Sequence, residues 1–204
     1  MVSEDVVSFV LSNLPPAPAS VLEVGAGAGD LAVRLTAAGY AVVAIDPAAG
    51  TPEVLPVRLI DLEQPASPFD AAVAVVSLHH VDPLEQSCAR LAEVLAPGAV
   101  LLVDELDVVR FDERAAEWWL EQRRALGYDE ASSPAEVIAR LRGDVHPLEP
   151  LNAALEPHFE MRMDWRGAYL YRFGLDEDLR TAEEELIATG GLPAIGVRFV
   201  GRRR

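Results

Sequence analysis

Three glycines alternate along one short stretch of this sequence, Ser-Val-Leu-Glu-Val-Gly-Ala-Gly-Ala-Gly-Asp at residues 20–30. Glycine has no Cβ, so it adopts positive φ angles cheaply and lets another group approach the main chain. Gly25, Gly27 and Gly29 follow an apolar run, as they would in a loop between a strand and a helix. The spacing therefore predicts a loop whose backbone binds a nucleotide-like ligand.

Two adjacent histidines, His79 and His80, follow a second apolar run at residues 71–76. Open α/β sheets bind substrates at the carboxyl ends of their strands, which is where these side chains would lie. An imidazole titrates near neutral pH and could take a proton from an oxygen, nitrogen or thiol nucleophile. A purely structural role, bonding the start of the next helix, stays open. Asp82 could complete a metal site, but no further ligand cluster supports one, and we predict none.

Continuous apolar runs that alternate with helical periodicity must position these residues. Leu31 and Leu35 mark one helical stripe, and Cys88 and Leu91 mark another that ends before Pro97-Gly98. Strands that are apolar throughout and separated by helices imply a parallel sheet covered on both faces. Five such strands are predicted, at residues 21–24, 41–46, 56–61, 71–76 and 99–104.

The second half of the chain is less regular. The aromatic run at residues 166–173 could line a pocket or form one buried face of a strand, and we favour the strand for Tyr171. The amphipathic start, with Val6 and Val10, could be a lid or an edge helix. The remaining pattern predicts helices at residues 111–126, 134–141, 151–155 and 176–189, and strands at 158–166 and 196–200.

Composition limits the classes of partner. The 204 residues are 50% hydrophobic and carry a formal charge of -16, which repels phosphate backbones and anionic lipid. We therefore predict one domain that binds no nucleic acid and no membrane, located in the cytoplasm because the acidic first residues do not resemble a secretory signal. Cys88 is the only cysteine, which excludes an intrachain disulfide. The closing Arg-Arg-Arg is interpreted as a solvated tail.

The glycine spacing separates two nucleotide-binding patterns. The dinucleotide fingerprint requires G-x-G-x-x-G/A, whereas Asp30 occupies its third glycine position here. Other features are Asp46 and Asp61 closing the second and third predicted strands, Ser-Leu-His-His-Val-Asp-Pro after the fourth, and Leu-Ala-Pro-Gly-Ala-Val-Leu-Leu-Val before the fifth. Together with Glu-Val-Gly-Ala-Gly-Ala-Gly, they resemble class I S-adenosylmethionine-dependent methyltransferases of the small-molecule type. The resemblance is close over residues 18–106 and extends to the remainder only in element order.

This resemblance implies a Rossmann-like fold with a seven-stranded, mostly parallel sheet, an antiparallel last strand and helices on both faces. It divides the single domain, residues 1–204, into an N-terminal helix or lid (1–17), a cofactor-binding half (18–106) and a substrate side (107–204). The implied cofactor is S-adenosyl-L-methionine, with S-adenosyl-L-homocysteine as product. The acceptor would be a small molecule with an oxygen, nitrogen, sulfur or carbon nucleophile. The oligomeric state stays open.

The resemblance also implies roles for individual residues. Glu23 would reach the ammonium group of the cofactor, Asp46 would accept both ribose hydroxyls, and Asp61 would accept the adenine amino group. Leu62 would donate its backbone N–H to the adenine ring, and Ser77 would lie near the methionyl amine. The rest of the implied cofactor site is backbone or loop, at Gly25, Ala26, Gly27, Gly29 and Pro47.

For the acceptor pocket we predict Trp118, Tyr169 and Arg172, from the region that closes over the acceptor in this family. Two alternative functions remain. The chain could bind S-adenosylmethionine or its product without catalysis, as a sensor or partner subunit. A nicotinamide-dependent reductase is disfavoured by Asp30 and by the absence of a Tyr-x-x-x-Lys pair, because the sequence contains no lysine.

Overall fold

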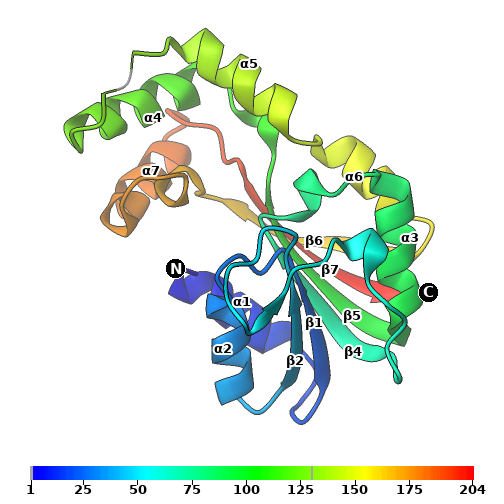
Figure 1. Cartoon of the computed structure of the whole chain (residues 1–204). Helices are drawn as coiled ribbons and strands as arrows, with labels where there is room; N and C mark the ends of the chain where they lie inside the picture. The colour runs from blue at the N-terminus through cyan, green and yellow to red at the C-terminus, as the bar shows by residue number, and fades with distance from the viewer. Residues whose placement is uncertain (1, 130) are drawn as a thin grey trace. The chain divides into compact units, whose positions relative to one another are not determined.

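A seven-stranded sheet organises the chain in the computed structural model, which describes residues 2–129 and 131–204 (Figure 1). The strand order is β3-β2-β1-β4-β5-β7-β6, and the first five of these strands pair in parallel. The last strands are antiparallel, so the predicted fold class is confirmed. The strands are β1 (Ser20–Val24), β2 (Ala41–Ile45), β3 (Val54–Leu55), β4 (Phe69–Val75), β5 (Leu95–Leu106), β6 (Phe159–Gly167) and β7 (Gly196–Arg203).

Helices connect and cover the strands. In the first half, α1 and α2 lie on one face of the sheet and α3 lies on the other (Figure 1). The helices are α1 (Glu4–Asn13), α2 (Asp30–Ala37), α3 (Leu84–Val94), α4 (Glu113–Ala125), α5 (Pro134–Asp144), α6 (Leu148–Leu155) and α7 (Arg180–Ala188). Short 3-10 turns are η1 (Leu59–Asp61), η2 (Leu78–His80), η3 (Val108–Arg110), η4 (Leu170–Arg172) and η5 (Glu177–Leu179).

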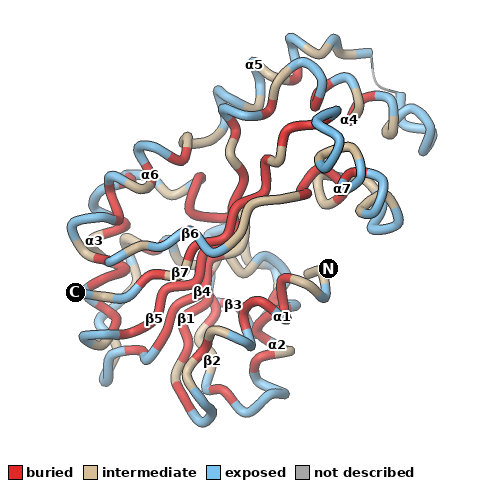
Figure 2. Tube along the Cα trace, turned by 180° about the vertical axis from the view of Figure 1, so that it is seen from behind, coloured by how far each residue is buried: buried red, intermediate tan, exposed pale blue. Residues whose placement is uncertain are grey.

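The core is built on the central strands, and β1, β4 and β5 are buried along most of their length (Figure 2). Helix α1 belongs to this core, because Val6 and Val10 are fully buried in one cluster with Val73 of β4. Its first turn is also fixed by an ion pair between Asp5 and Arg198, whose guanidinium binds Asp104 as well. Helix α1 therefore packs on the sheet, and the choice between a lid and an edge helix stays a prediction.

The chain divides into two compact units. The first holds Met1–Glu105, Glu149–Asp164 and Arg198–Arg204, and the second holds Leu106–Leu148 and Trp165–Val197. The first unit contains all of the predicted cofactor-binding half except its last residue. The prediction of one domain with a substrate side at residues 107–204 stays a prediction.

The third predicted strand, residues 56–61, is wrong. The strand in this place is β3, and it ends at Leu55 because Pro56 has no N–H to donate to a ladder. The chain continues into the 3-10 turn η1, which carries Asp61. Asp61 therefore ends a 3-10 turn instead of closing a strand.

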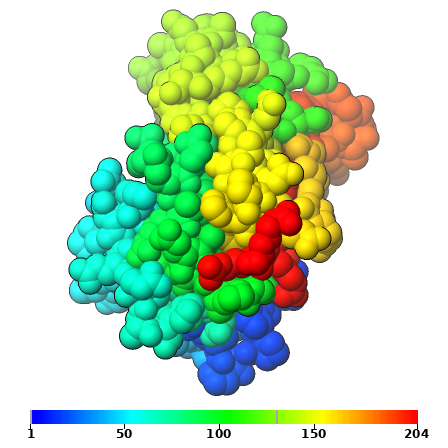
Figure 3. Space-filling view, turned by 90° about the vertical axis from the view of Figure 1, so that its right-hand side faces the viewer, coloured from blue at the N-terminus to red at the C-terminus, as the bar shows by residue number. Residues whose placement is uncertain are grey.

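Two further expectations are corrected. Tyr171 is buried as expected, but it lies in the 3-10 turn η4 and not in a strand, because Glu183 accepts its backbone N–H. The C-terminal arginines do not form a free tail, because Arg202 and Arg203 belong to β7, although Arg202 and Arg204 are exposed. Arg202 donates to the carbonyl of Gly98 and Arg204 donates to that of Glu156, so the red segment in Figure 3 lies against the green and yellow ones.

Candidate functional site

The glycine loop between β1 and α2 has the backbone that its sequence predicts. Gly25, Gly27 and Gly29 have φ angles of 71°, 55° and 86°. A Cβ on Gly25 would stand 2.2 Å from the Cβ of Ser77, and one on Gly29 would stand 3.0 Å from Val54. A Cβ on Gly27 would meet nothing within 4 Å. Protein atoms therefore occupy the space beside the outer glycines, and only the middle glycine faces open space.

Asp46 follows β2 and braces this loop. Its carboxylate accepts the N–H of Gly27 at 2.9 Å and that of Ala48 at 2.8 Å, one on each oxygen. Each oxygen has a second lone pair, so the carboxylate can still accept hydroxyl donors. The backbone N–H groups of Gly25 and Ala26 both donate to the carbonyl of Ile45, which joins the end of β1 to the end of β2.

Glu23 is a buried acid on β1, with only 4% of its surface exposed. Its Oε2 has no hydrogen-bond partner among the residues that the structure describes. Burial raises the pKa of Glu23 to about 7, opposed by a backbone hydrogen bond from Ala32 and reinforced by the charge of Asp30. Burying a hydrogen-bond acceptor without a donor costs free energy, so this oxygen is suited to accept a hydrogen bond from a cationic or N–H donor.

A cavity of about 390 Å³ opens at the carboxyl ends of β1, β2 and β4 in the first unit. This is where an open α/β sheet binds its ligands. Five predicted site residues line it: Gly25, Asp46, Pro47, Ser77 and His80. Asp82, considered above only as a metal ligand, also lines it. Sequence reasoning missed the other lining residues, which are Val24, Ile45, Val57, Arg58, Leu59, Val76, Val81 and Ser87.

The predicted adenine partners lie beside this cavity and not on its lining. Asp61 is exposed and accepts from Nε of Arg58 at 2.6 Å, whereas Arg58 itself lines the cavity. The Asp61 carboxylate raises the pKa of the Arg58 guanidinium through this hydrogen bond. The carbonyl of Leu62 accepts from Nε of Arg90 at 2.9 Å. The N–H of Leu62 donates to the carbonyl of Leu59 in the turn η1.

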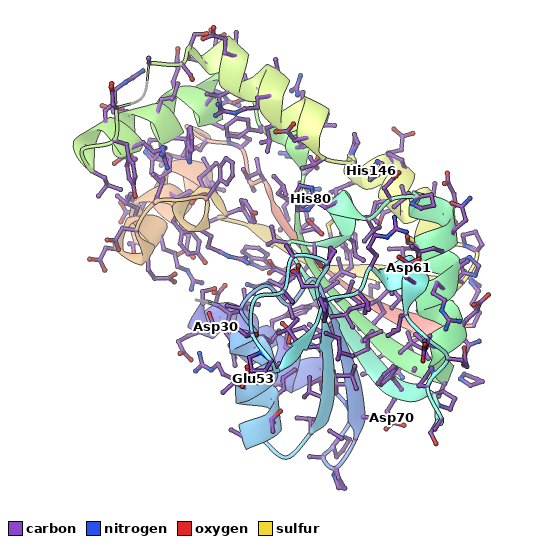
Figure 4. All side chains as sticks on the ribbon, in the orientation of Figure 1. Asp30, Glu53, Asp61, Asp70, His80 and His146 are labelled. Carbon is purple, nitrogen blue, oxygen red and sulfur yellow. The ribbon has the colours of Figure 1, made fainter. Side chains whose placement is uncertain are left out.

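The two histidines have different environments. His79 is 4% exposed, and its Nδ1 lies 2.5 Å from Oε2 of the buried Glu105. His80 is exposed and lines the cavity from the turn after β4 (Figure 4). Their ring centroids are 4.1 Å apart. Of the pair, only the His80 imidazole is placed to meet a molecule in the cavity.

The predicted acceptor residues belong to the second unit. Trp118 is half-buried on α4, while its neighbour Trp119 is buried and donates from Nε1 to the carbonyl of Phe173 at 2.7 Å. Tyr169 is 4% exposed, with the guanidinium of Arg172 at 5.3 Å from its ring centre. Of the two adjacent tryptophans, Trp119 therefore belongs to the core.

In residues 2–129 and 131–204, no group of three or more histidine, cysteine, aspartate or glutamate side chains is placed to hold a metal ion. Over the same ranges no helix has the length and apolar character needed to cross a membrane.

Comparison with known proteins identifies one family. A family model described as a methyltransferase domain matches residues 3–132. No curated protein matches the sequence.

Solved structures share the fold at low sequence identity. An S-adenosylmethionine-dependent methyltransferase from Mesorhizobium loti is 17% identical, with a TM-score of 0.59 and 96% of each chain covered. The N-methyltransferase NodS from Bradyrhizobium japonicum, in complex with S-adenosylhomocysteine, is 13% identical over 98% of this chain and 86% of that one, with a TM-score of 0.57. The [4+2]-cyclase SpnF is 18% identical over 98% and 80%, with a TM-score of 0.60. At these identities the likeness shows the fold alone.

Proposed function

The chain belongs to the methyltransferase domain family, and from this membership we propose that it transfers a methyl group from S-adenosylmethionine to a small-molecule acceptor. The observation that carries the proposal is the cavity at the carboxyl ends of β1, β2 and β4, which brings Asp46, Ser77 and His80 together. S-adenosylmethionine is the cofactor that the family membership and the glycine loop support. The identity of the acceptor is the part that the family does not determine.

Residues on the cavity lining and next to it fit this cofactor, although Glu23 and Gly27 are not themselves part of the lining. The unpartnered Oε2 of Glu23 is suited to an ammonium group, because a buried carboxylate oxygen gains most from a charged donor. Asp46 keeps acceptor capacity for two ribose hydroxyls. The open space at Gly27 supports close approach to the loop backbone, and we keep Gly25, Ala26, Gly29, Pro47 and Ser77 as the rest of this part of the site.

The adenine end of the site remains a proposal for Asp61 and Leu62. Because Asp61 is paired with Arg58, the pair presents a planar guanidinium at the cavity, which can stack on an aromatic ring. Val57 and Leu59 add apolar wall beside it. The nicotinamide alternative has no support from these residues.

When bound, the cofactor supplies an electrophilic methyl group on a sulfonium. The chain itself has to position the acceptor beside this methyl group, exclude water from both and take up one proton. The imidazole of His80 is placed to take the proton of an acceptor oxygen, nitrogen or thiol. We therefore propose His80, and no longer His79, as the base. Alignment in a cavity with apolar walls would provide most of the remaining rate enhancement.

For the acceptor we propose contacts from Trp118, Tyr169 and Arg172 in the second unit. A half-buried tryptophan and an arginine beside a tyrosine ring suit a small, partly aromatic or anionic molecule. The cytoplasmic location stays a prediction from the acidic first residues, and the exclusion of nucleic acid stays a prediction from the charge of -16.

Calorimetry with S-adenosylhomocysteine and with NAD tests the proposal. We expect binding of the former alone, and an Asp46→Ala variant should bind roughly 10 to 150-fold more weakly, because charged hydrogen bonds are worth about 1.5 to 3 kcal/mol. Binding of NAD alone would overturn the assignment.

A screen of oxygen, nitrogen, sulfur and carbon nucleophiles then separates enzyme from binding module. Formation of S-adenosylhomocysteine with any acceptor supports turnover. Tight cofactor binding with no product from any acceptor supports the sensor or partner-subunit alternative instead.

A further inference from the structure

The turn after β4 is held by one buried side chain that the proposed function does not use. Glu105, at the end of β5, is 0% exposed. Its Oε1 accepts three consecutive backbone N–H groups, from Ser77 at 3.0 Å, Leu78 at 2.9 Å and His79 at 3.3 Å. Its Oε2 takes the fourth contact, with the His79 imidazole.

We propose that Glu105, together with His79, is a positioning residue for cofactor binding, because it fixes the turn that carries Ser77 and His80 to the cavity. This inference rests on the proposed function. It assigns no chemistry to Glu105 itself, which has no contact with the cavity. Its effect passes through the backbone of Ser77, Leu78 and His79.

The turn needs such a restraint because its backbone is strained. Val76 has a φ of 52°, and it is the one non-glycine residue with positive φ in residues 2–129 and 131–204. A β-branched residue in this region is a conformational outlier, and its strained backbone persists only where surrounding contacts hold it. The N–H of Val76 donates to the carbonyl of Asp104, next to Glu105, so both contacts hold the turn against β5.

The restrained turn supports the glycine loop directly. The hydroxyl of Ser77 donates to the carbonyl of Val24 at 2.7 Å, just before Gly25. The Cβ of Ser77 occupies the space where a side chain at Gly25 would stand. Loss of the Glu105 contacts would therefore let Ser77 move away from the loop, and His80 would move with the same turn.

His79 contacts the second carboxylate oxygen of Glu105. Its buried ring fills the space beside Glu105, and the contact between Nδ1 and Oε2 uses the carboxylate oxygen that makes none of the three backbone bonds. The pair is thus a closed unit of two buried polar side chains. Removing one partner leaves the other without its counterpart inside the core.

The chain contains a matched control. Glu183 is also 0% exposed and accepts the N–H groups of Tyr169, Leu170 and Tyr171 at 2.8, 2.9 and 2.9 Å. It lies in the second unit and does not line the cavity. Truncating Glu105 or Glu183 therefore removes the same kind of contact from a similar turn.

The test compares S-adenosylhomocysteine affinity in Glu105→Ala and Glu183→Ala, with thermal unfolding to establish that each variant is folded. We expect Glu105→Ala to weaken binding about 10-fold or more, because a binding-competent turn would be only a minor state. Glu183→Ala should lower Tm by a similar amount and leave the dissociation constant within about 2-fold. Equal affinity losses in both variants, or none in Glu105→Ala, would overturn the inference.

Conservative replacement provides the second readout. Glu105→Gln keeps an oxygen for the backbone N–H groups, so it should restore most of the affinity that Glu105→Ala loses. Hydrogen exchange at Ser77, Leu78 and His79 in the ligand-free protein should be faster in Glu105→Ala than in Glu105→Gln. Unchanged exchange in Glu105→Ala would contradict the restraint itself.

If Glu105→Ala does not fold, His79→Phe carries the test, because it keeps a buried ring and removes only the contact with Oε2. We then expect an affinity loss of about 3-fold or more, and parent-like binding would overturn the inference. Failure of the proposed function is separate: in that case the parent protein itself binds no S-adenosylhomocysteine, and both proposals fall. A parent that binds tightly beside an unaffected Glu105→Ala rejects the positioning role alone.

Discussion

Two turns of this chain are built alike, one after β4 and one after β6. Their first residues, Ser77 and Tyr169, have nearly the same backbone angles, φ -141° and ψ -34° against φ -147° and ψ -31°. Each opens a 3-10 turn whose three leading N–H groups bind one fully buried glutamate, Glu105 or Glu183. One of these two turns therefore lies in each compact unit.

The turns differ in what surrounds them. The first has a strained residue before it, a histidine paired with its glutamate and a cavity beside its fourth residue, His80. In the second, the hydrogen bonds of the glutamate within residues 2–129 and 131–204 come from backbone N–H groups, and the fourth residue, Arg172, lies over the ring of Tyr169. A 3-10 turn bound to a buried glutamate is therefore a structural feature in itself. Its contribution to function depends on the surface at which its last side chain lies.

The largest expected effect concerns the glycine packed against each turn. Gly25→Ala should weaken S-adenosylhomocysteine binding about 100-fold or more, because the new Cβ needs a φ of 71° and stands 2.2 Å from the Cβ of Ser77. Calorimetry on the folded fraction measures the loss. Parent-like affinity would show that Ser77 can move without consequence for the site.

Gly196 provides the matched substitution at the second turn. A Cβ there would stand 2.9 Å from the carbonyl oxygen of Ala168, just before Tyr169, without any requirement for positive φ. Gly196→Ala should lower Tm and leave the dissociation constant of the folded protein unchanged. If both variants lose affinity equally, the two turns do not differ in function.

The second effect separates the two histidines of the first turn. His80→Ala should keep S-adenosylhomocysteine affinity and lose roughly 100-fold in turnover once an acceptor is known, because it removes the proposed base. The pH dependence of kcat near neutrality should disappear with it. Full activity with a flat pH profile from about 6 to 9 would show that catalysis depends on positioning alone.

A third effect sharpens the contrast among buried glutamates, since Glu23 has an unpartnered oxygen whereas Glu105 and Glu183 have none. Burial raises the pKa of Glu23 to about 7 in the folded protein, above its ordinary value of 4.5. The folded state therefore binds more protons than the unfolded state between these values. Stability falls as pH rises across this window, by on the order of 3 kcal/mol, and this contribution is constant above it.

Urea unfolding at pH 5 and pH 8 measures this slope in the parent and in Glu23→Gln. The variant should lack the slope and be the more stable protein at pH 8, yet bind S-adenosylhomocysteine about 10-fold more weakly because it lacks the carboxylate. The opposite change in stability would contradict the raised pKa of Glu23. Unchanged binding would place its carboxylate outside the cofactor site.

Local patterns predict most of the first unit. Strand β1 was expected at residues 21–24 and spans Ser20–Val24, and the loop after it has positive φ at all three glycines. The prediction fails where one residue interrupts a pattern, as Pro56 does by removing a ladder donor and ending β3 early. It also fails where a distant residue decides the structure.

The two glutamates are the clearest case of such distant effects. Glu105 binds N–H groups 26 to 28 positions away, and no periodicity of the segment around His79 signals this. One signal was present in the sequence: Asp104 and Glu105 close an otherwise apolar strand, and buried acids require partners. No local pattern of this kind marks Arg172, whose role is predicted from the family resemblance alone.

The smallest expected effect tests the fourth residue of the second turn. Arg172 lies 5.3 Å from the ring centre of Tyr169, a contact worth about 0.5 to 1 kcal/mol at an exposed site. Arg172→Ala should therefore leave the fold and S-adenosylhomocysteine affinity intact. If Arg172 contacts the acceptor, KM for the acceptor should rise about 3 to 10-fold with kcat unchanged, the signature of lost uniform binding. Arg140→Ala, an exposed arginine on α5, removes the same charge and should leave KM at its parent value. Equal rises in both variants would indicate a general effect of net charge, and no rise in either would make the second turn purely structural.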